Sequence, residues 1–372
     1  MRKTSATAMA VTFALLVLQV AGAAAGNAAL AARAANPVST RFSITGQISG
    51  VATTSASDAW AVGYSGVYDK NQETLLLHWN GRSWTQVTTP KPVSGELDGV
   101  YAESASNVWA VGFASTPDGA NDRSLIMHWN GKRWIRSGPT VPGYLQAVAA
   151  SGSSVWAVGE TYDPSLVMHL TGGRWYIVPS PGPAVAELLC VVVTGPGTAW
   201  VGGQVGDGAN PSANLLLRWN GSVWKSVSSP MQGADRGTYG LARGPAGTLL
   251  AVGNYVSPKT GNTTPLSMVW NGKTWRKVAV PAAVSGLGNV GSSPGGTVWA
   301  VGNASNGPAM LHWTGKAWTE VKSPQVASQD YFYGVAASSA SNAWAVGTSA
   351  TSDSDNAVTQ TLILHWNGKT WS

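Results

Sequence analysis

Five histidines and one cysteine are the side chains of this 372-residue chain best suited to nucleophilic or general-base chemistry. The histidines recur about one repeat apart, so we expect neither a metal cluster nor a catalytic pair among them. Each is instead expected to be buried between repeats and hydrogen-bonded to neighbouring backbone. Cys190 lies in an apolar run, which predicts a small buried side chain rather than a nucleophile. The histidines are His78, His128, His169, His312 and His365.

The carboxylates offer one possible catalytic pair. A glycosidase needs two carboxylates roughly 5 to 9.5 Å apart, and Asp98 and Glu160 could approach each other from different repeats. The chain has only 17 acidic residues, however, and neither of the two is expected to have a second acid beside it. Asp353 and Asp355 share one loop but are too few for a calcium site. An enzyme is therefore less favoured than a binding protein, and no cofactor or metal ion is expected.

A repeated motif, Trp-Ala-Val-Gly or a near copy, marks the elements that must position these side chains. About 20 residues after each copy of it comes a second motif, clearest as Leu-His-Trp-Asn-Gly-Arg-Ser-Trp over residues 77–84. All 19 tryptophans fall into three slots of this repeat, which predicts packing between repeats rather than sugar-stacking platforms. The first motif, Trp-Ala-Val-Gly or a near copy, recurs every 44–50 residues, at Trp60, Trp109, Trp156, Trp200, Leu250, Trp299 and Trp344.

Each repeat predicts four short strands. Apolar runs are separated by a Ser/Asn turn, a variable loop and an Asn-Gly turn, in the last repeat at residues 334–337, 343–347 and 362–366. At Asn80-Gly81 we expect a two-residue type I′ turn, with Trp79 opposite Arg82. Seven such units predict an all-β fold, a seven-bladed β-propeller with four antiparallel strands per blade, which fills residues 36–372 as a single domain.

Closure of the ring has two interpretations. The last repeat stops at Trp371-Ser372, where the other repeats continue for several residues. We favour a latch, in which the segment around Arg41–Thr45 pairs beside this short strand. The alternative is that the sequence record ends early.

At these motifs the chain resembles known propeller families. Its blade length, glycine-ended second strand and tryptophan at the start of the fourth strand are similar to kelch-type blades, although the kelch Gly-Gly pair is matched only at Gly202-Gly203. The Trp-Asn-Gly-Lys-Thr-Trp hairpin resembles those of tectonin-type and Asp-box propellers, without the Ser-x-Asp of an Asp box. The repeat is most similar to Trp-rich propellers of exported bacterial proteins, a resemblance that implies no single activity.

Residues 1–35 predict a signal peptide and a short N-terminal segment. A basic start is followed by an apolar run over residues 8–20 and by small residues, the pattern of a secretory leader. This run is too short to span a bilayer, although an uncleaved anchor is the alternative. We therefore expect a secreted, extracellular, monomeric protein without a membrane span in its mature form. Its Lys and Arg residues include no run of four, so no nucleic-acid partner is expected.

Function is expected on the rim that carries the variable loops, because binding residues concentrate on loops held by a rigid scaffold. Side chains that enter each first strand or leave each second strand should face the mouth of the central channel there. The candidate ligand-binding residues are Tyr64, Asp98, Phe113, Gln146, Glu160, Gln204, Tyr239, Asn254, Asn303 and Tyr333.

Aromatic rings, amides and two carboxylates around a concave mouth suit a polar, uncharged ligand. The sequence thus predicts a non-catalytic module that binds a glycan or an extracellular or cell-surface protein. A propeller-type glycoside hydrolase or lyase that uses carboxylates at the channel mouth is the alternative, and a purely structural role is a third possibility. The same rim residues could also be merely solvated.

Overall fold

The computed structural model describes one compact unit, Thr40–Ser372. The leader predicted within residues 1–35, and the domain boundary predicted at residue 36, lie outside the described residues. No helix within the described part is both long and apolar enough to cross a membrane. The described residues are 40–68, 70–89, 94–116, 122–161, 165–180, 186–206, 213–230, 237–257, 259–305, 307–351 and 358–372.

The first four blades are four-stranded antiparallel sheets. Blade one contains β1 (Gly46–Ser55), β2 (Asp58–Ser65), β3 (Glu73–Trp79) and β4 (Trp84–Gln86). Blade two contains β5 (Gly95–Ser104), β6 (Asn107–Ala114), β7 (Arg123–Trp129) and β8 (Trp134–Arg136). Blade three contains β9 (Tyr144–Ser151), β10 (Ser154–Glu160), β11 (Ser165–Thr171) and β12 (Arg174–Ile177). Blade four contains β13 (Ala186–Gly195), β14 (Thr198–Val205), β15 (Ala213–Trp219) and β16 (Trp224–Ser226).

The remaining three blades repeat this order, except that a single bridge between Trp366 and Trp371 takes the place of the fourth strand in blade seven. Blade five contains β17 (Gly237–Arg243), the short 3₁₀ helix η1 (Pro245–Gly247), β18 (Leu249–Val256), β19 (Thr263–Trp270) and β20 (Trp275–Lys277). Blade six contains β21 (Val284–Ser292), β22 (Val298–Ala304), β23 (Gly307–Trp313) and β24 (Trp318–Glu320). Blade seven contains β25 (Gln329–Ser339), β26 (Asn342–Ala350) and β27 (Gln360–Trp366).

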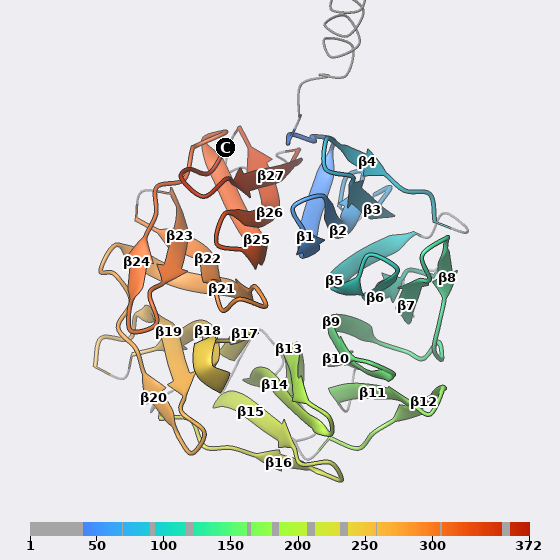
Figure 1. Cartoon of the computed structure of the whole chain (residues 1–372), viewed down its shortest axis with the longest axis horizontal. Coiled ribbons are helices and arrows are strands. Elements are labelled where there is room, and N and C mark those ends of the chain that lie inside the picture. Colours follow the sequence, from blue (N-terminus) through green and yellow to red (C-terminus); the bar gives the residue numbers. More distant parts are fainter. Residues whose placement is uncertain are drawn as a thin grey trace, which may run out of the picture. The chain divides into compact units, whose positions relative to one another are not determined.

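The seven sheets form a closed ring, which confirms the predicted seven-bladed propeller. The first strand of each blade contacts the first strands of both neighbouring blades, and β1 contacts both β5 and β25 (Figure 1). These first strands line the central channel, and the later strands of each blade follow outward. One face of each blade therefore packs on the next blade all the way around.

Tryptophans fill the space between blades, as the repeat predicts. The Trp60 ring of blade one lies 5.1 Å from both Trp129 and Trp134 of blade two. The same arrangement recurs at five other blade interfaces, and in blade five Leu250 takes the tryptophan's place. Burying an aromatic ring of this size stabilises by roughly 2 to 3 kcal/mol, so the repeat itself holds the ring together.

The hairpin between the third and fourth strands differs from the prediction. Trp79 pairs with Trp84 rather than with Arg82, so the turn takes four residues instead of two. A type I′ turn needs positive φ at both central residues, but only the glycine has one, at 89°. The Asn80 side chain instead accepts hydrogen bonds from the backbone N–H groups of Arg82 and Ser83. An Asx turn has replaced the tight hairpin.

The N-terminal segment closes the ring as the favoured latch. Backbone hydrogen bonds join Thr361 N to Ile44 O (2.9 Å) and Gly46 N to Thr359 O (3.0 Å), at the start of β27. At the other end of β27, Ser372 and His365 exchange two backbone hydrogen bonds. The outer edge of blade seven is therefore shared between residues from both ends of the described chain.

Candidate functional site

A β-bulge in the first strand of every blade shapes the channel mouth. The inner strand carries one unpaired residue there, and a bulge re-aims such a side chain. All seven unpaired residues were expected from the sequence to enter the mouth: Ser49, Asp98, Gln146, Leu189, Tyr239, Gly288 and Tyr333. Asp98, Gln146, Tyr239 and Tyr333 are thus the four site predictions that sit on a bulge.

The glycine that ends each Trp-Ala-Val-Gly motif explains why the strands approach so closely at this level. A Cβ on it would lie 1.8–2.1 Å from a carbonyl oxygen of the first strand in every blade, nearer than any real contact. The next residue of the second strand is the predicted mouth residue, and it pairs with a residue that the sequence analysis overlooked. These partners are Gln47, Glu96, Tyr144, Glu187, Gly237, Gly286 and Tyr331.

Glu96 is the centre of a polar network between blades one and two. Its Oε1 accepts hydrogen bonds from Ser49 Oγ (2.7 Å) and Gln47 Nε2 (3.3 Å). Its Oε2 accepts one from Gln72 Nε2 (3.1 Å). The carboxyl of Asp98, two residues along β5, completes the set. Both oxygens of Glu96 are thus held in place by neighbours.

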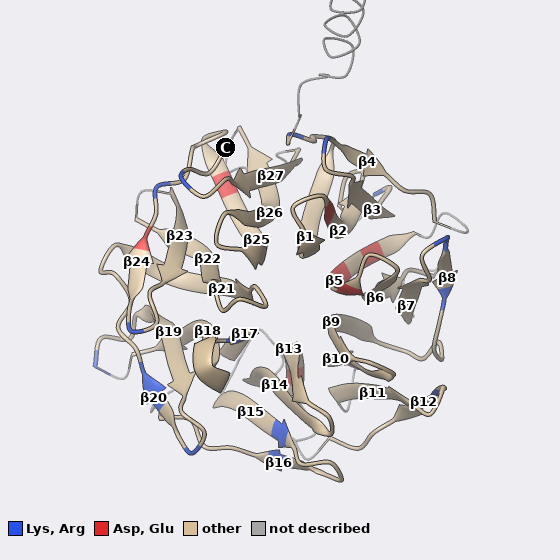
Figure 2. Ribbon diagram, in the orientation of Figure 1, with Lys and Arg blue, Asp and Glu red and all other residues tan. Residues whose placement is uncertain are grey.

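The carboxyls of Glu96 and Asp98 are hydrogen-bonded neighbours. Burial raises the pKa of both carboxyls. The negative charge of Glu96 and the hydrogen bond to it raise the pKa of Asp98 further, whereas the same hydrogen bond lowers the pKa of Glu96. Asp98 is therefore the more readily protonated of the two. Figure 2 shows acidic residues on the inner strand β5 and Lys or Arg on the outer strand β20.

Three tyrosines gather beside this network, where blades seven and one meet. Tyr64 is buried, and burial together with the neighbouring Glu96 raises its pKa to about 12. Its ring lies 5.9 Å from that of Tyr68, which is 59% exposed. Tyr333 is 40% exposed and accepts a 3.5 Å hydrogen bond from Thr348 Oγ1. We call Tyr64, Tyr68, Tyr333 and Glu96 the mouth cluster.

A second group of acids lies between blades three and four. Burial and the nearby Glu187 raise the pKa of Glu160 to about 7. Glu187 in turn accepts a 2.6 Å hydrogen bond from Gln204 Nε2, and Gln204 is buried. The enzyme alternative required that Asp98 and Glu160 could approach each other, but the structure gives each another acidic partner, Glu96 and Glu187 respectively.

The remaining predicted residues have separate surroundings. Phe113 packs edge to face on Tyr144, with ring centroids 4.9 Å apart. Asn254 Oδ1 accepts a hydrogen bond from Leu287 N of the next blade, so this side chain joins two blades. Asn303 is exposed, and Gln146 and Tyr239 are half-buried. The ten predictions therefore divide into structural members and exposed members of one rim.

Glu96 and Glu187 are the mouth acids that the sequence analysis missed. They stand two residues before the bulge in the inner strands of blades two and four, in the same register as Gln47. Counting the alternation of side chains along each inner strand, with the bulge residue left out, would have identified both residues. The expectation that neither Asp98 nor Glu160 has a second acid beside it was therefore wrong.

The histidines lie near the opposite rim, and their partners differ from the prediction. Each imidazole is half-buried against the second-strand tryptophan of its own blade, most closely in His169 on Trp156 (3.7 Å). Four of them bond a side chain of the first turn instead of neighbouring backbone, for example His365 Nε2 to Asn342 Oδ1 (2.8 Å). Burial lowers the pKa of four: His128, His169, His312 and His365.

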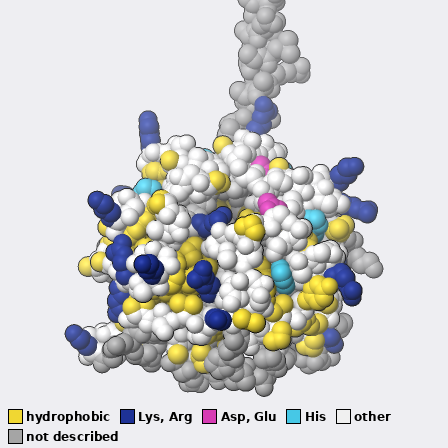
Figure 3. Space-filling model, turned by 60° about the horizontal axis from the view of Figure 1, so that its bottom comes forward, with side chains coloured by type: hydrophobic (Ala, Val, Ile, Leu, Met, Phe, Trp, Pro, Cys, Tyr) yellow, Lys and Arg dark blue, Asp and Glu magenta, His cyan; other side chains and the backbone are white. Residues whose placement is uncertain are grey.

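This opposite rim, made of first-to-second and third-to-fourth strand hairpins, is rich in cations. We call it the hairpin rim. The sequence scatters these Lys and Arg residues, but the repeat gathers them, and Figure 3 shows Lys and Arg outnumbering Asp and Glu on one face. The third-to-fourth hairpins contribute Arg82, Lys132, Arg133, Arg174, Lys273, Lys316 and Lys369. The absence of a nucleic-acid partner remains a prediction.

Metal and thiol chemistry find little support in the described part of the chain. No group of three or more His, Cys, Asp or Glu residues there could hold a metal ion, and Asp353 and Asp355 lie outside the described residues. Cys190 is buried, as predicted, and burial raises the pKa of its thiol. Its thiolate form is therefore disfavoured.

No protein-family model matches the chain, and no match was found among curated protein sequences. Solved structures are similar in fold. The β-propeller domain of the Trilobed protease from Pyrococcus furiosus, described as having an open velcro topology, has a TM-score of 0.59 at 8% identity, with 89% of this chain and 96% of that chain covered. The GH74 xyloglucanase from Xanthomonas campestris has a TM-score of 0.59 at 15% identity, with 90% and 55% covered.

Virginiamycin B lyase from Staphylococcus aureus has a TM-score of 0.55 at 13% identity, with 87% of this chain and 98% of that chain covered. At these identities the likeness shows a shared β-propeller fold and carries no activity across. The kelch-like and tectonin-like character of the blades remains a prediction.

Proposed function

We propose that this protein is an exported, non-catalytic binding module that takes a glycan or a protein segment at the mouth cluster. The carrying observation is that two exposed tyrosine rings, Tyr68 and Tyr333, stand beside a polar network already fixed by hydrogen bonds. Exposed rings on a rigid base supply contact area at low entropic cost.

The chemistry of the mouth cluster favours binding over catalysis. Both oxygens of Glu96 accept hydrogen bonds from protein donors, and burial raises the pKa of Asp98, which is engaged with Glu96. A general acid or base must reach the substrate proton, and neither carboxyl is presented for this. Tyrosine rings, in contrast, stack on sugar faces or on peptide side chains while their hydroxyl groups hydrogen-bond.

The test is a glycan array and an extracellular-protein pull-down with the mature protein, followed by affinity measurement on any hit. Tyr68→Ala and Tyr333→Ala should each weaken binding at least about ten-fold, about 1.4 kcal/mol. Tyr176→Ala is the matched control, because Tyr176 is 47% exposed but lies on β12. Binding that survives both mouth substitutions, or that falls equally in the control, would contradict this site.

A second function, a glycoside hydrolase or lyase, is favoured by one observation. Glu160 has a pKa of about 7 and a carboxylate neighbour in Glu187, and pairs of acids pushed apart in pKa supply general acids in glycosidases. If a glycan hit is turned over, Glu160→Gln should lower the rate at least about 100-fold with little change in binding. A hit that binds without any turnover contradicts the enzyme.

A further inference from the structure

The central channel carries one charged side chain whose role the mouth does not explain. The first strands enclose a cavity of about 810 Å³, within the range of small-molecule sites. Among the described residues that line it, Asp98 is the only Asp or Glu, and Arg243 is the only Lys, Arg or His. Asp98 is engaged with Glu96, so Arg243 is the one cation of the channel wall.

Arg243 breaks the repeat at its position. It is the last residue of β17 and pairs with Leu249, the first residue of β18. A single arginine in an otherwise small-residue ring points to a local task rather than to a structural one. The residues in the same register of the other blades are small: Thr53, Ala102, Ala150, Val193, Ser292 and Ala337.

The Arg243 guanidinium is held by one hydrogen bond, and the side chain is exposed in the channel. Its Nη2 donates a 2.5 Å hydrogen bond to the Thr194 carbonyl of the neighbouring blade. Within the described ranges, no carboxylate lies at ion-pairing distance from Arg243. A guanidinium has five N–H donors, which leaves most of its capacity for a ligand.

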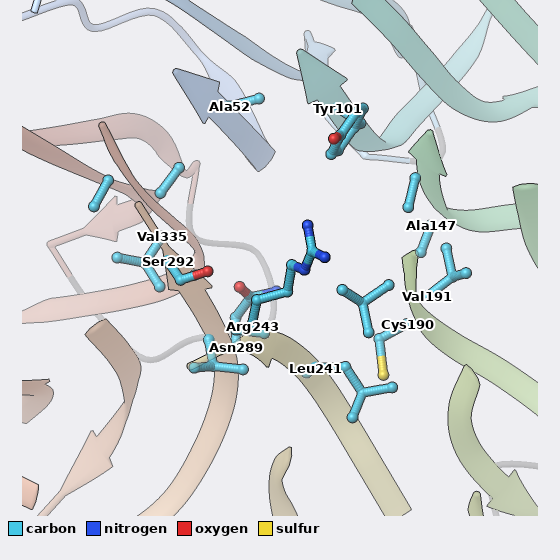
Figure 4. Close-up of a pocket in the computed structure, with 18 of the residues that line it drawn as sticks. Ala52, Tyr101, Ala147, Cys190, Val191, Leu241, Arg243, Asn289, Ser292 and Val335 are labelled. Carbon is cyan, nitrogen blue, oxygen red and sulfur yellow. The ribbon is translucent and has the colours of Figure 1, made fainter. Parts of the chain in front are cut away.

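Hydroxyl groups converge on the same space. Figure 4 shows Arg243 extended toward the middle of the channel, with the hydroxyls of Tyr101 and Ser292 turned toward that space. Tyr101 comes from blade two and Ser292 from blade six, so the three groups approach from different sides. Arg243 is near enough to Tyr101 to oppose the rise that burial and Glu103 cause in the tyrosine pKa.

The turn that follows Arg243 is held by hydrogen bonds within it. It runs through η1, in which Ala246 has a φ of 54°, the one positive φ of a non-glycine residue in the described chain. Gly244 N donates to Thr248 O (2.8 Å), and Thr248 Oγ1 donates to Pro245 O (2.7 Å). This turn differs from the Ser-Ala-Ser turns of blades one, two and seven.

Much of the rest of the wall is aliphatic, although it also carries polar side chains such as Asn289 and Thr53. Figure 4 places Ala52, Ala147, Val191, Leu241 and Val335 around the same space. An unneutralised guanidinium beside these aliphatic side chains matches a single carboxylate attached to an aliphatic body. A doubly charged phosphate would leave one charge without a partner, and a neutral ligand would leave the guanidinium unused.

We propose that the channel is a binding site for a monocarboxylate with a short aliphatic body, whose carboxylate is held by Arg243 and whose chain packs on the aliphatic wall. The site lies within the channel, apart from the mouth cluster, and it does not depend on the proposed function.

Sodium hexanoate is the probe, titrated calorimetrically into the mature protein, with hexan-1-ol and inorganic phosphate as comparison ligands. Hexanoate should bind one per chain, at least about ten-fold more tightly than either comparison ligand. Arg243→Gln should weaken hexanoate at least about ten-fold, and Arg243→Lys should give an intermediate loss, because an ammonium keeps the charge without the fork. Arg82→Gln, on an exposed hairpin of the hairpin rim, is the matched control and should leave binding unchanged.

A crystal soaked in 6-bromohexanoate locates the ligand independently of the variants, so a poorly folded Arg243→Gln does not leave the question open. An anomalous bromine peak inside the channel, among the aliphatic wall residues, supports the site. A peak elsewhere overturns it. A failure of hexanoate to bind also overturns it, as does phosphate or hexanol binding as tightly as hexanoate. The same holds if Arg82→Gln weakens hexanoate binding as much as Arg243→Gln does.

Discussion

The titratable groups at the two ends of the same blades have pKa values that are shifted in opposite directions. At the channel mouth, burial raises the pKa of the carboxyls Glu96, Asp98 and Glu160. Near the hairpin rim, burial lowers the pKa of histidines such as His169 and His365. Both shifts have one cause, the cost of a charge away from water, but they change the stability of the fold in opposite directions as the pH rises.

The two ends also differ in how they follow the repeat. The histidines occupy one slot and each packs against the tryptophan of its own blade, so they share one structural role. The bulge residues of the mouth differ from blade to blade. The hairpin end thus maintains the scaffold, whereas the mouth carries the variation from which a binding site is made.

The sign of each pH effect follows from linkage. A carboxyl with a raised folded-state pKa contributes stability below its unfolded pKa and loses it as pH rises through the folded value. A histidine with a lowered folded-state pKa contributes stability above its unfolded pKa and loses it as pH falls through the folded value. The mouth therefore weakens the fold toward alkaline pH, and the histidines weaken it toward acid.

The largest expected effect comes from breaking the mouth network. Glu96→Ala removes the acceptor of Ser49, Gln47 and Gln72 in a buried place. Orphaned donors of this kind cost about 2 to 3 kcal/mol in the free energy of unfolding, which urea denaturation at neutral pH measures.

Glu103→Ala is the matched control, because Glu103 lies at the other end of the same strand and is exposed. It accepts hydrogen bonds from Gly152 N and Asn107 Nδ2, so we expect a loss of under about 1 kcal/mol. Equal losses in the two variants would remove the energetic distinction between mouth and hairpin rim.

The fold was readable from the sequence because every tryptophan belongs to a repeat, and the structure confirms that tryptophans pack between blades. The mouth was only partly readable. A bulge shifts the strand by one residue, so it conceals the pairing of Glu96 with Phe113 and of Glu187 with Gln204. The predicted register of the hairpin between the third and fourth strands was wrong because an Asn side chain can cap a longer turn, which composition does not reveal. Arg243 was overlooked because its neighbours come from other blades.

A smaller effect is expected at Glu160. Its pKa rises from 4.5 to about 7 on folding, so stability is lost as pH rises between these values. Glu160→Gln removes that loss and should stabilise the protein by about 1 kcal/mol near pH 8, after allowance for partial exposure, and by nothing near pH 4. Urea denaturation at both pH values measures this. A pH-independent gain at Glu160 would refute the raised pKa.

The smallest effect is expected at His169. Its pKa lies below 6.5 because burial disfavours the cation, so protonation near pH 5 should destabilise the fold by less than about 0.5 kcal/mol. The cost is small because the slot accepts positive charge: in blade four Arg218 occupies it, 5.5 Å from the Trp200 ring. His169→Gln keeps a hydrogen-bonding group near Ser154 and should flatten the acid limb of the stability profile without changing the alkaline limb. A change in the alkaline limb would mean that the two ends of the blade are coupled and do not titrate independently.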